Sequence, residues 1–143
     1  MIARRQLRTA ERELVDAARA ARRRAHAPYS RFKVGAAVRG RDGRIFAGCN
    51  VENASLGACI CAERGALVQA VAGGMRPGQL QAVAVYAEDD PPSAPCGMCL
   101  QFLVEFARDA DILLANPRGV ERWRLAALLP HPFRTFPNDR GRR

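Results

Sequence analysis

Three of the five cysteines stand in two short motifs whose residue types suit metal or redox chemistry. The motif Pro95-Cys96-Gly97-Met98-Cys99 contains a C-x-x-C pair, which can bind one metal ion or form a redox couple. The other motif, Cys61-Ala62-Glu63-Arg64, begins with a cysteine at the predicted start of a helix. If the two helix starts lie side by side, three thiolates converge.

Three thiolates are one ligand short of a closed structural zinc site, whereas a catalytic zinc keeps three protein ligands and leaves the fourth position to water. Helix N-termini stabilise negative thiolates, and bound zinc lowers the pKa of its water toward about 7. Glu63, two residues after Cys61, is placed to act as a base without being a ligand. A ligand-x-Glu motif with a later Pro-Cys-x-x-Cys is typical of zinc-dependent nucleobase deaminases.

The elements that must position these residues predict an α/β domain. Helical spacing of apolar residues predicts helices over 8–25, 61–71 and 96–108, and a short helical turn over 125–129. Strands are predicted over 34–38, 45–51, 82–86 and 112–115, with a fifth over 119–124, and Asp42-Gly43 predicts a hairpin between the first two. The strand–helix–strand alternation predicts parallel pairing with right-handed crossovers, and hence a mixed sheet of about five strands with helices on its faces.

Length and composition predict a single domain over residues 1–143, with a flexible tail from about residue 134. The sequence has no run of about 18 apolar residues and no apolar segment typical of a secretory signal, so we expect no membrane span and a cytoplasmic location. An odd number of cysteines in that compartment argues against a disulfide framework. The net charge of +9 permits polyanion binding, but aromatic residues are not interleaved with the arginines, which favours a solvated surface over a nucleic-acid site.

The motifs, in this order and spacing, resemble those of the small zinc-dependent cytidine deaminases of the homotetrameric kind, over nearly the whole chain. The matching segments are Pro28-Tyr29-Ser30-Arg31-Phe32-Lys33-Val34-Gly35-Ala36-Ala37, Gly48-Cys49-Asn50-Val51-Glu52-Asn53-Ala54, the two cysteine motifs, and Leu128-Leu129-Pro130 followed by Phe133. The resemblance implies a three-layer fold, one zinc ion per chain, a homotetramer, and hydrolytic deamination of cytidine and deoxycytidine in pyrimidine salvage.

The resemblance also implies roles at the reacting end of the substrate. Cys61, Cys96 and Cys99 would bind zinc, and Glu63 would carry a proton from the activated water to ring N3 and then to the departing ammonia. The backbone amide of Ala62 would meet the pyrimidine carbonyl. Arg64 would hydrogen-bond the zinc thiolates.

Further along the substrate, Asn50 and Glu52 would hold the ribose hydroxyls and Phe32 would pack on the pyrimidine. Phe133 would reach into the site of a neighbouring subunit. Plainer alternatives are a core position for Phe32, a turn cap for Asn50 and a surface anchor for Phe133. Cys49 and Cys59 are expected to be buried or idle thiols rather than metal ligands, and His26 and His131 are expected to be structural or solvent-facing.

Two positions depart from the family pattern. Leu100 stands where many members carry an arginine, whose charge would offset the thiolates, so we expect a more electron-rich metal and a higher pKa for its water. Leu56 stands where a tyrosine is frequent, near a subunit contact. Both departures keep open a modified or antibiotic aminopyrimidine nucleoside as the substrate. Nucleic-acid editing is disfavoured by the aromatic content of 6%, and a non-catalytic zinc module is disfavoured by Glu63.

Overall fold

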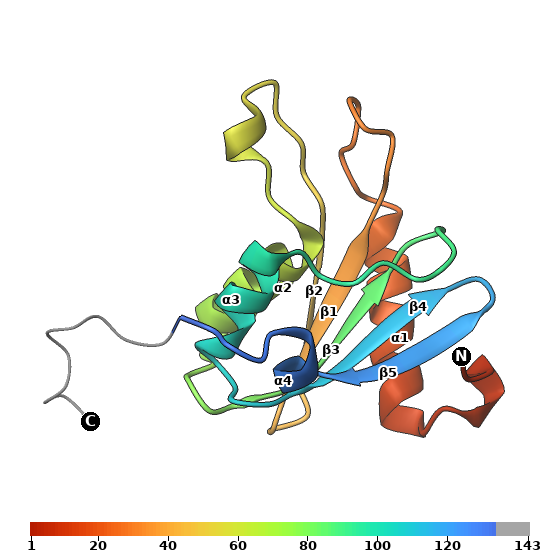
Figure 1. The fold of residues 1–143 in the computed structure, drawn as a ribbon, viewed down its shortest axis with the longest axis vertical. Helices are drawn as coiled ribbons and strands as arrows, with labels where there is room; N and C mark the ends of the chain where they lie inside the picture. Colours follow the sequence, from red (N-terminus) through yellow and green to blue (C-terminus); the bar gives the residue numbers. More distant parts are fainter. Residues whose placement is uncertain (134–143) are drawn as a thin grey trace, which may run out of the picture.

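The computed structural model describes residues 1–133, and its centre is one five-stranded sheet in the order β2-β1-β3-β4-β5 (Figure 1). The strands are β1 (Gly35–Gly40), β2 (Ile45–Cys49), β3 (Leu80–Tyr86), β4 (Asp111–Asn116) and β5 (Gly119–Arg124). β1 pairs antiparallel with β2 and β3, β3 pairs parallel with β4, and β4 pairs antiparallel with β5. The predicted mixed sheet is therefore confirmed, while the tail expected from about residue 134 lies outside the described residues.

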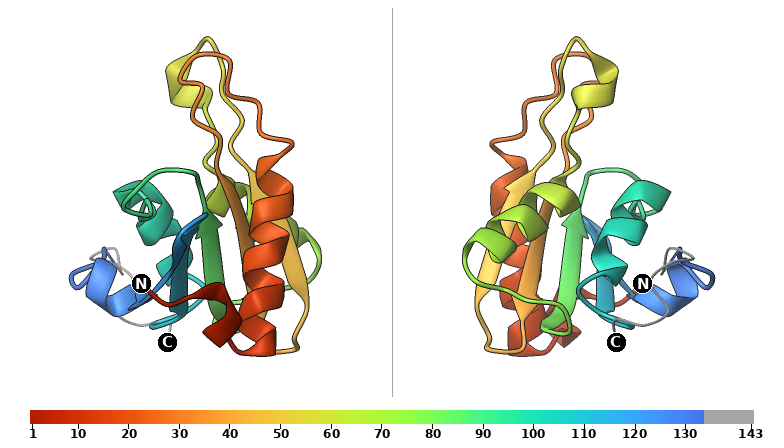
Figure 2. Two further views of the ribbon diagram at one scale, coloured as in Figure 1. Left: turned by 90° about the vertical axis from the view of Figure 1, so that its right-hand side faces the viewer. Right: turned by 90° about the vertical axis from the view of Figure 1, so that its left-hand side faces the viewer.

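Helices cover both faces of the sheet (Figure 2). The helix α1 (Thr9–Arg22) lies on one face, and α2 (Ala62–Ala72), α3 (Gly97–Val104) and the short α4 (Leu125–Leu128) lie toward the other. Two 3-10 turns, η1 (Arg4–Gln6) and η2 (Leu56–Ala58), complete the described elements. This arrangement confirms the predicted three layers.

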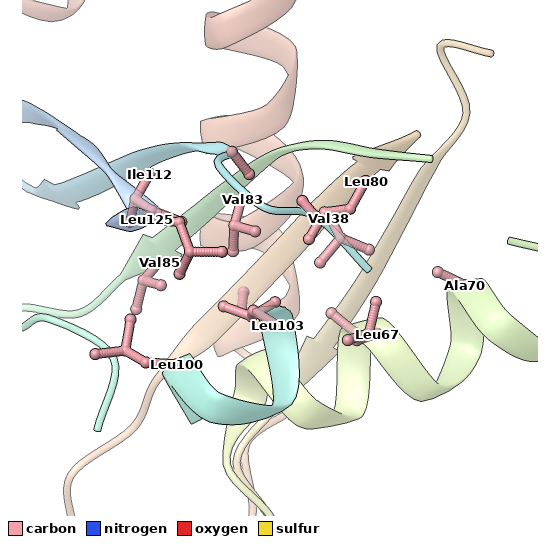
Figure 3. Close-up of a cluster of buried hydrophobic side chains, with 14 of the residues drawn as sticks. Val38, Leu67, Ala70, Leu80, Val83, Val85, Leu100, Leu103, Ile112 and Leu125 are labelled. Carbon is pink, nitrogen blue, oxygen red and sulfur yellow. The ribbon is translucent and has the colours of Figure 1, made fainter. Parts of the chain in front are cut away.

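Alternate residues of the central strands belong to two hydrophobic clusters, one on each face of the sheet. In β3, Val83 and Val85 point to the α2–α3 side, where they pack with Leu67 and Leu103 (Figure 3). The neighbouring Ala84 belongs to the cluster beneath α1. Since side chains alternate along a strand and both faces are covered, the middles of the central strands are continuously apolar, over residues 36–38, 82–85 and 112–115.

Two glycines let helices lie directly on the sheet. A Cβ atom at Gly35 would fall 2.0 Å from the carbonyl oxygen of Ala18 in α1. A Cβ atom at Gly48 would fall 2.4 Å from the amide nitrogen of Ala66 in α2. Gly48 therefore sets how closely α2 approaches the sheet, and α2 follows directly on Cys61.

The predicted third helix is too long at its C-terminal end. It ends at Val104 rather than at Arg108, because the chain turns and the carbonyl of Phe106 accepts the amides of Gly78 (2.9 Å) and Leu80 (3.3 Å). Backbone pairing with the start of β3 thus replaces the last helical turn.

The first predicted helix and the second predicted strand also end early. α1 ends at Arg22 rather than at residue 25, and β2 ends at Cys49 rather than at residue 51. The reason is a backbone pairing in which the His26 amide donates to Asn50 (3.0 Å) and the Glu52 amide donates to His26 (2.8 Å). The predicted parallel pairing is confirmed for β3 and β4. The strands β2 and β3 also run parallel to each other, but they do not pair because β1 lies between them.

Two segments project beyond the ends of the strands: residues 23–34 and 50–60 (Figures 1 and 2). We call them the nucleoside loops, after the substrate contacts that the resemblance implies for residues in them. They are joined near their base by a bridge between His26 and Val51, and Val51 pairs in turn with Ile60. Within residues 1–133, no helix combines the length and hydrophobicity needed to cross a membrane.

Candidate metal centre and active site

Three cysteine sulfurs meet at the N-termini of two helices. Cys61 is the N-cap residue of α2, Cys96 is the N-cap residue of α3, and Cys99 lies in the first turn of α3. The three sulfur atoms lie within 4.8 Å of one another. Cys99 is fully buried and Cys96 is exposed, so the cluster opens to solvent on one side. The predicted convergence of the two motifs is therefore observed.

The sulfur cluster fits a zinc ion in size and charge. Tetrahedral zinc with bonds of about 2.3 Å places its sulfur ligands about 3.8 Å apart, which small side-chain rotations reach from this spacing. A hydrogen bond from Cys99, with help from Arg64, lowers the pKa of Cys61 to about 5. The same bond and burial raise the pKa of Cys99. Soft donors with a thiolate among them at neutral pH suit zinc.

The first turn of α2 supplies an acid and an amide beside the sulfurs. Glu63 is only 5% exposed, and burial raises the pKa of its carboxyl above the usual range. Ala62 is the first residue of α2, where amides have no partner within the helix. A buried carboxyl and a helix-start amide are thus adjacent to the cluster of cysteine sulfurs.

Arg64 brings positive charge to the cysteines. Its Nη2 atom donates to the carbonyl of Cys59 at 3.0 Å and lies 3.9 Å from the sulfur of Cys61. Its Nε atom is buried and has no hydrogen-bond partner among residues 1–133. The guanidinium therefore offsets negative charge on the sulfurs, as the resemblance implies.

The residues expected to contact the substrate further from the metal lie on the nucleoside loops. Phe32 is 42% exposed, so the alternative of a core position is wrong. Asn50 donates from Nδ2 to the carbonyl of Phe32 and accepts the amide of Val34, both at 2.8 Å. Asn50 thus holds the backbone of the other loop rather than capping a turn, and its side-chain amide retains one N–H and one lone pair for another partner.

The Glu52 carboxylate ties the two loops together. Its Oε2 atom accepts the amides of Tyr29 (2.9 Å) and Ser30 (3.2 Å), and its Oε1 atom accepts the hydroxyl of Ser30. Sequence reasoning did not single out Ser30, because a serine in a loop has many local uses and nothing in its spacing points to Glu52. The contact is visible only after folding.

Phe133 is held through its backbone, and the residue as a whole is 58% exposed. The side-chain amide of Gln101 accepts the Phe133 N–H at 2.9 Å and donates to its carbonyl at 2.7 Å. Gln101, in α3, was another residue that sequence reasoning missed. Its contact spans more than thirty residues and has no local signal.

The two departures from the family pattern lie in different surroundings. Leu100 is buried and belongs to the cluster between the sheet and α2 and α3 (Figure 3). Leu56 is 73% exposed in η2, within the second nucleoside loop. Cys49 and Cys59 are half-buried free thiols outside the sulfur cluster, as expected.

Comparison with known proteins identifies relatives of the chain. The family described as the cytidine and deoxycytidylate deaminase zinc-binding region matches residues 8–115. A protein named cytidine deaminase from Sporosarcina psychrophila is 41% identical over 123 residues, which cover 85% of this chain and 89% of the relative. One from Halalkalibacterium halodurans is 42% identical over 122 residues, 84% of this chain and 91% of the relative.

Solved structures agree with the sequence relatives. The crystal structure of cytidine deaminase from Burkholderia pseudomallei has a TM-score of 0.81 and 50% identity, and the match covers 85% of this chain and 97% of that one. The structure from Mycobacterium tuberculosis has a TM-score of 0.72 and 38% identity, over 86% of this chain and 96% of that one. Sequence and fold therefore point to one family.

Proposed function

The chain belongs to the cytidine deaminase family of zinc-dependent hydrolytic enzymes, and from that premise we propose that it converts cytidine and deoxycytidine to uridine and deoxyuridine with release of ammonia. One observation carries the proposal: three cysteine sulfurs converge beside the buried Glu63 at two helix starts. The names of the relatives favour cytidine over the modified nucleosides that Leu56 and Leu100 left open.

The metal is held by Cys61, Cys96 and Cys99 in this proposal. Bound zinc supplies a Lewis acid that lowers the pKa of a water molecule and so yields a nucleophile near neutral pH. Arg64 reduces the negative charge of the thiolates, which keeps the centre electrophilic. The three cysteines that would hold the metal come from the starts of two helices that pack against the same side of the sheet, and Glu63 lies in the first turn of one of them.

Glu63 moves the protons of the reaction. Its carboxylate takes a proton from the attacking water and gives it to ring N3, while the water oxygen bonds to C4. The Glu63 carboxylate then takes the remaining proton from the hydroxyl now on C4 and delivers it to the exocyclic amine. The C4–N bond breaks, the C4 carbonyl forms and ammonia leaves. Burial raises the pKa of the Glu63 carboxyl above its usual range, the direction that favours a group that both takes and releases a proton.

The remaining residues hold the nucleoside. The Ala62 amide donates to the pyrimidine carbonyl, and the exposed ring of Phe32 packs on the base. Asn50 and Glu52 hydrogen-bond the ribose hydroxyls with the donor and acceptor capacity that their loop contacts leave over. The sugar-binding residues thus also shape the loop that carries Phe32.

We further propose that the protein is a homotetramer in the cytoplasm, with one zinc ion per chain and a role in pyrimidine salvage. In this tetramer, Phe133 reaches into the active site of a neighbouring subunit. Exposed apolar side chains on adjoining elements support an interface: Val68 on α2, Met98 and Phe102 on α3, and Leu56 on the second nucleoside loop. Met98 and Phe102 are four residues apart and share one helix face. None of the five cysteines, all of which lie within residues 1–133, is paired in a disulfide, which suits a reducing compartment. Sedimentation tests the assembly: a mass of four chains is expected, and a monomer at working concentration contradicts it.

Cytidine turnover tests the proposed activity. Purified protein with its zinc content measured should deaminate cytidine, seen as the ultraviolet change that accompanies uridine formation. Glu63→Ala should keep its zinc and lose turnover by at least about a hundredfold, because the proton path is removed. Zinc-loaded wild type without turnover, or full activity in the variant, would refute the proposal.

A further inference from the structure

Ser30 connects two residues to which the proposed function gives substrate contacts. Its hydroxyl is hydrogen-bonded to Oε1 of Glu52, and its oxygen accepts the backbone N–H of Phe32 at 3.0 Å. An ionised carboxylate only accepts hydrogen bonds, so the hydroxyl proton points to Glu52 and an oxygen lone pair points to Phe32. One side chain thereby joins the sugar-side carboxylate to the backbone of the base-side aromatic residue.

The two oxygens of Glu52 have different partners. Oε2 accepts two backbone amides, those of Tyr29 and Ser30, whereas Oε1 accepts the Ser30 hydroxyl. The Ser30 hydroxyl is also the main reason that the pKa of Glu52 lies below its usual range. Oε1 has lone-pair capacity for a further donor such as a sugar hydroxyl, and Ser30 fixes where that oxygen lies.

The backbone beside Ser30 depends on such contacts. Arg31 has a φ of +59°, in the left-handed region that side chains other than glycine seldom adopt. Asn50 holds the carbonyl of Phe32 and the amide of Val34, while the amide of Phe32 is held by Ser30. Removal of the Ser30 hydroxyl leaves both the Phe32 amide and Oε1 of Glu52 without these partners.

We propose that Ser30 is a positioning residue that sets the preference for nucleosides carrying sugar hydroxyls. It acts through Glu52 on the sugar and through the Phe32 backbone on the placement of the aromatic ring. The inference rests on the proposed function, because it requires Glu52 to contact a ribose hydroxyl. Ser30 takes no part in the chemical step, so its loss affects KM and leaves kcat nearly unchanged.

The test compares cytidine with 2′,3′-dideoxycytidine, which lacks both sugar hydroxyls. Ser30→Ala should raise KM for cytidine about fivefold, the effect of one hydrogen bond, with kcat within about twofold of wild type. The preference for cytidine over the dideoxy compound should fall by up to the same factor, because only cytidine has sugar hydroxyls for Glu52 while both nucleosides have the base that Phe32 contacts. Ser30→Thr, which keeps the hydroxyl, should restore it. Ser55→Ala is the matched control, since the Ser55 hydroxyl makes no cap hydrogen bond to η2.

Calorimetric binding of the same two nucleosides to the zinc-loaded proteins gives the preference without turnover. The role of Ser30 is overturned if Ser30→Ala loses affinity for both nucleosides equally, so that the preference between them is unchanged. It is also overturned if Ser30→Thr is as impaired as Ser30→Ala. Wild type that binds cytidine in preference to the dideoxy compound but does not deaminate it refutes the proposed function alone. Wild type without any preference refutes the sugar role of Glu52 and the inference with it.

Discussion

The metal centre and the nucleoside loops are built in opposite ways. The metal centre takes its side chains from the N-termini of α2 and α3, which pack against the sheet over a continuous core, and Cys99 and Glu63 are buried. The nucleoside loops project beyond the strands and are held by hydrogen bonds to Glu52 and Asn50. The difference indicates that core packing preorganises the residues proposed for the chemistry, whereas the loops proposed to bind the nucleoside are positioned by polar contacts between them.

The largest effect should follow from a break in the metal centre itself. Cys99→Ala removes a fully buried ligand, so the variant should lose its zinc and all measurable turnover. Metal analysis of the purified protein and the cytidine assay check this together. Cys49→Ala, which removes a half-buried thiol outside the cluster, should keep both zinc and activity. Retention of zinc by Cys99→Ala would contradict the assigned ligand set.

Two glycine substitutions compare the packing of the two regions. Gly48→Ala would place a methyl group 2.4 Å from the Ala66 amide nitrogen and force α2 off the sheet, which should destabilise the fold by about 3 kcal/mol. Gly57→Ala, in the second nucleoside loop, meets nothing within 4 Å and should change stability by less than about 0.5 kcal/mol. Urea unfolding of both variants measures the contrast, and equal losses would contradict it.

A substitution in the nucleoside loops should affect binding alone. Glu52→Gln replaces an ionised acceptor, and KM for cytidine should rise by about 10- to 100-fold, the worth of one hydrogen bond to a charged group. The kcat value should stay within a few-fold of wild type, because Glu63 and the sulfur cluster are untouched. Michaelis kinetics with the zinc-loaded variant check this. A large fall in kcat with KM unchanged would show that the two regions are not separable.

The smallest effect concerns the α1 face, away from both regions. Hydrogen bonds from Arg122 at 2.9 and 2.8 Å, with further ones from Arg8, lower the pKa of Glu11 from 4.5 to about 2. Since the folded-state pKa is the lower one, the stability from Glu11 is present above about pH 4.5 and is lost as the pH falls toward 2.

That contribution should be about 1 kcal/mol, because solvent screens the half-exposed Arg122. Urea unfolding should show wild type more stable than Glu11→Gln at pH 6, and the gap should narrow toward pH 3. A gap independent of pH would show that the Glu11 charge is not the cause.

The sequence was sufficient for the parts of the molecule that local patterns control. Apolar periodicity predicted the strands and helices, and the two cysteine motifs predicted the sulfur cluster, because Cys61 and Cys96 stand at helix starts that pack together. The ends of elements were predicted less well. Val104 ends α3 because the Phe106 carbonyl pairs with backbone amides near the start of β3, a long-range contact with no local pattern.

The same limit applies to the nucleoside loops. The roles of Asn50 and Glu52 came from resemblance, but their hydrogen bonds to the backbone around Phe32 depend on how two loops meet after folding. Ser30 and Gln101 were missed for this reason. Hydrophobic patterning reports burial, and it carries no information on which loop polar groups face each other.

The most direct test of the account compares zinc-loaded Glu63→Gln and Glu52→Gln, with cytidine binding measured by calorimetry and turnover by absorbance. Glu63→Gln should bind cytidine within about threefold of wild type and lose turnover by at least about a hundredfold. Glu52→Gln should bind cytidine more weakly and turn over what it binds at nearly the wild-type rate. If Glu63→Gln keeps its turnover, or if both variants lose binding and turnover together, the division between a rigid catalytic centre and separate nucleoside loops is contradicted.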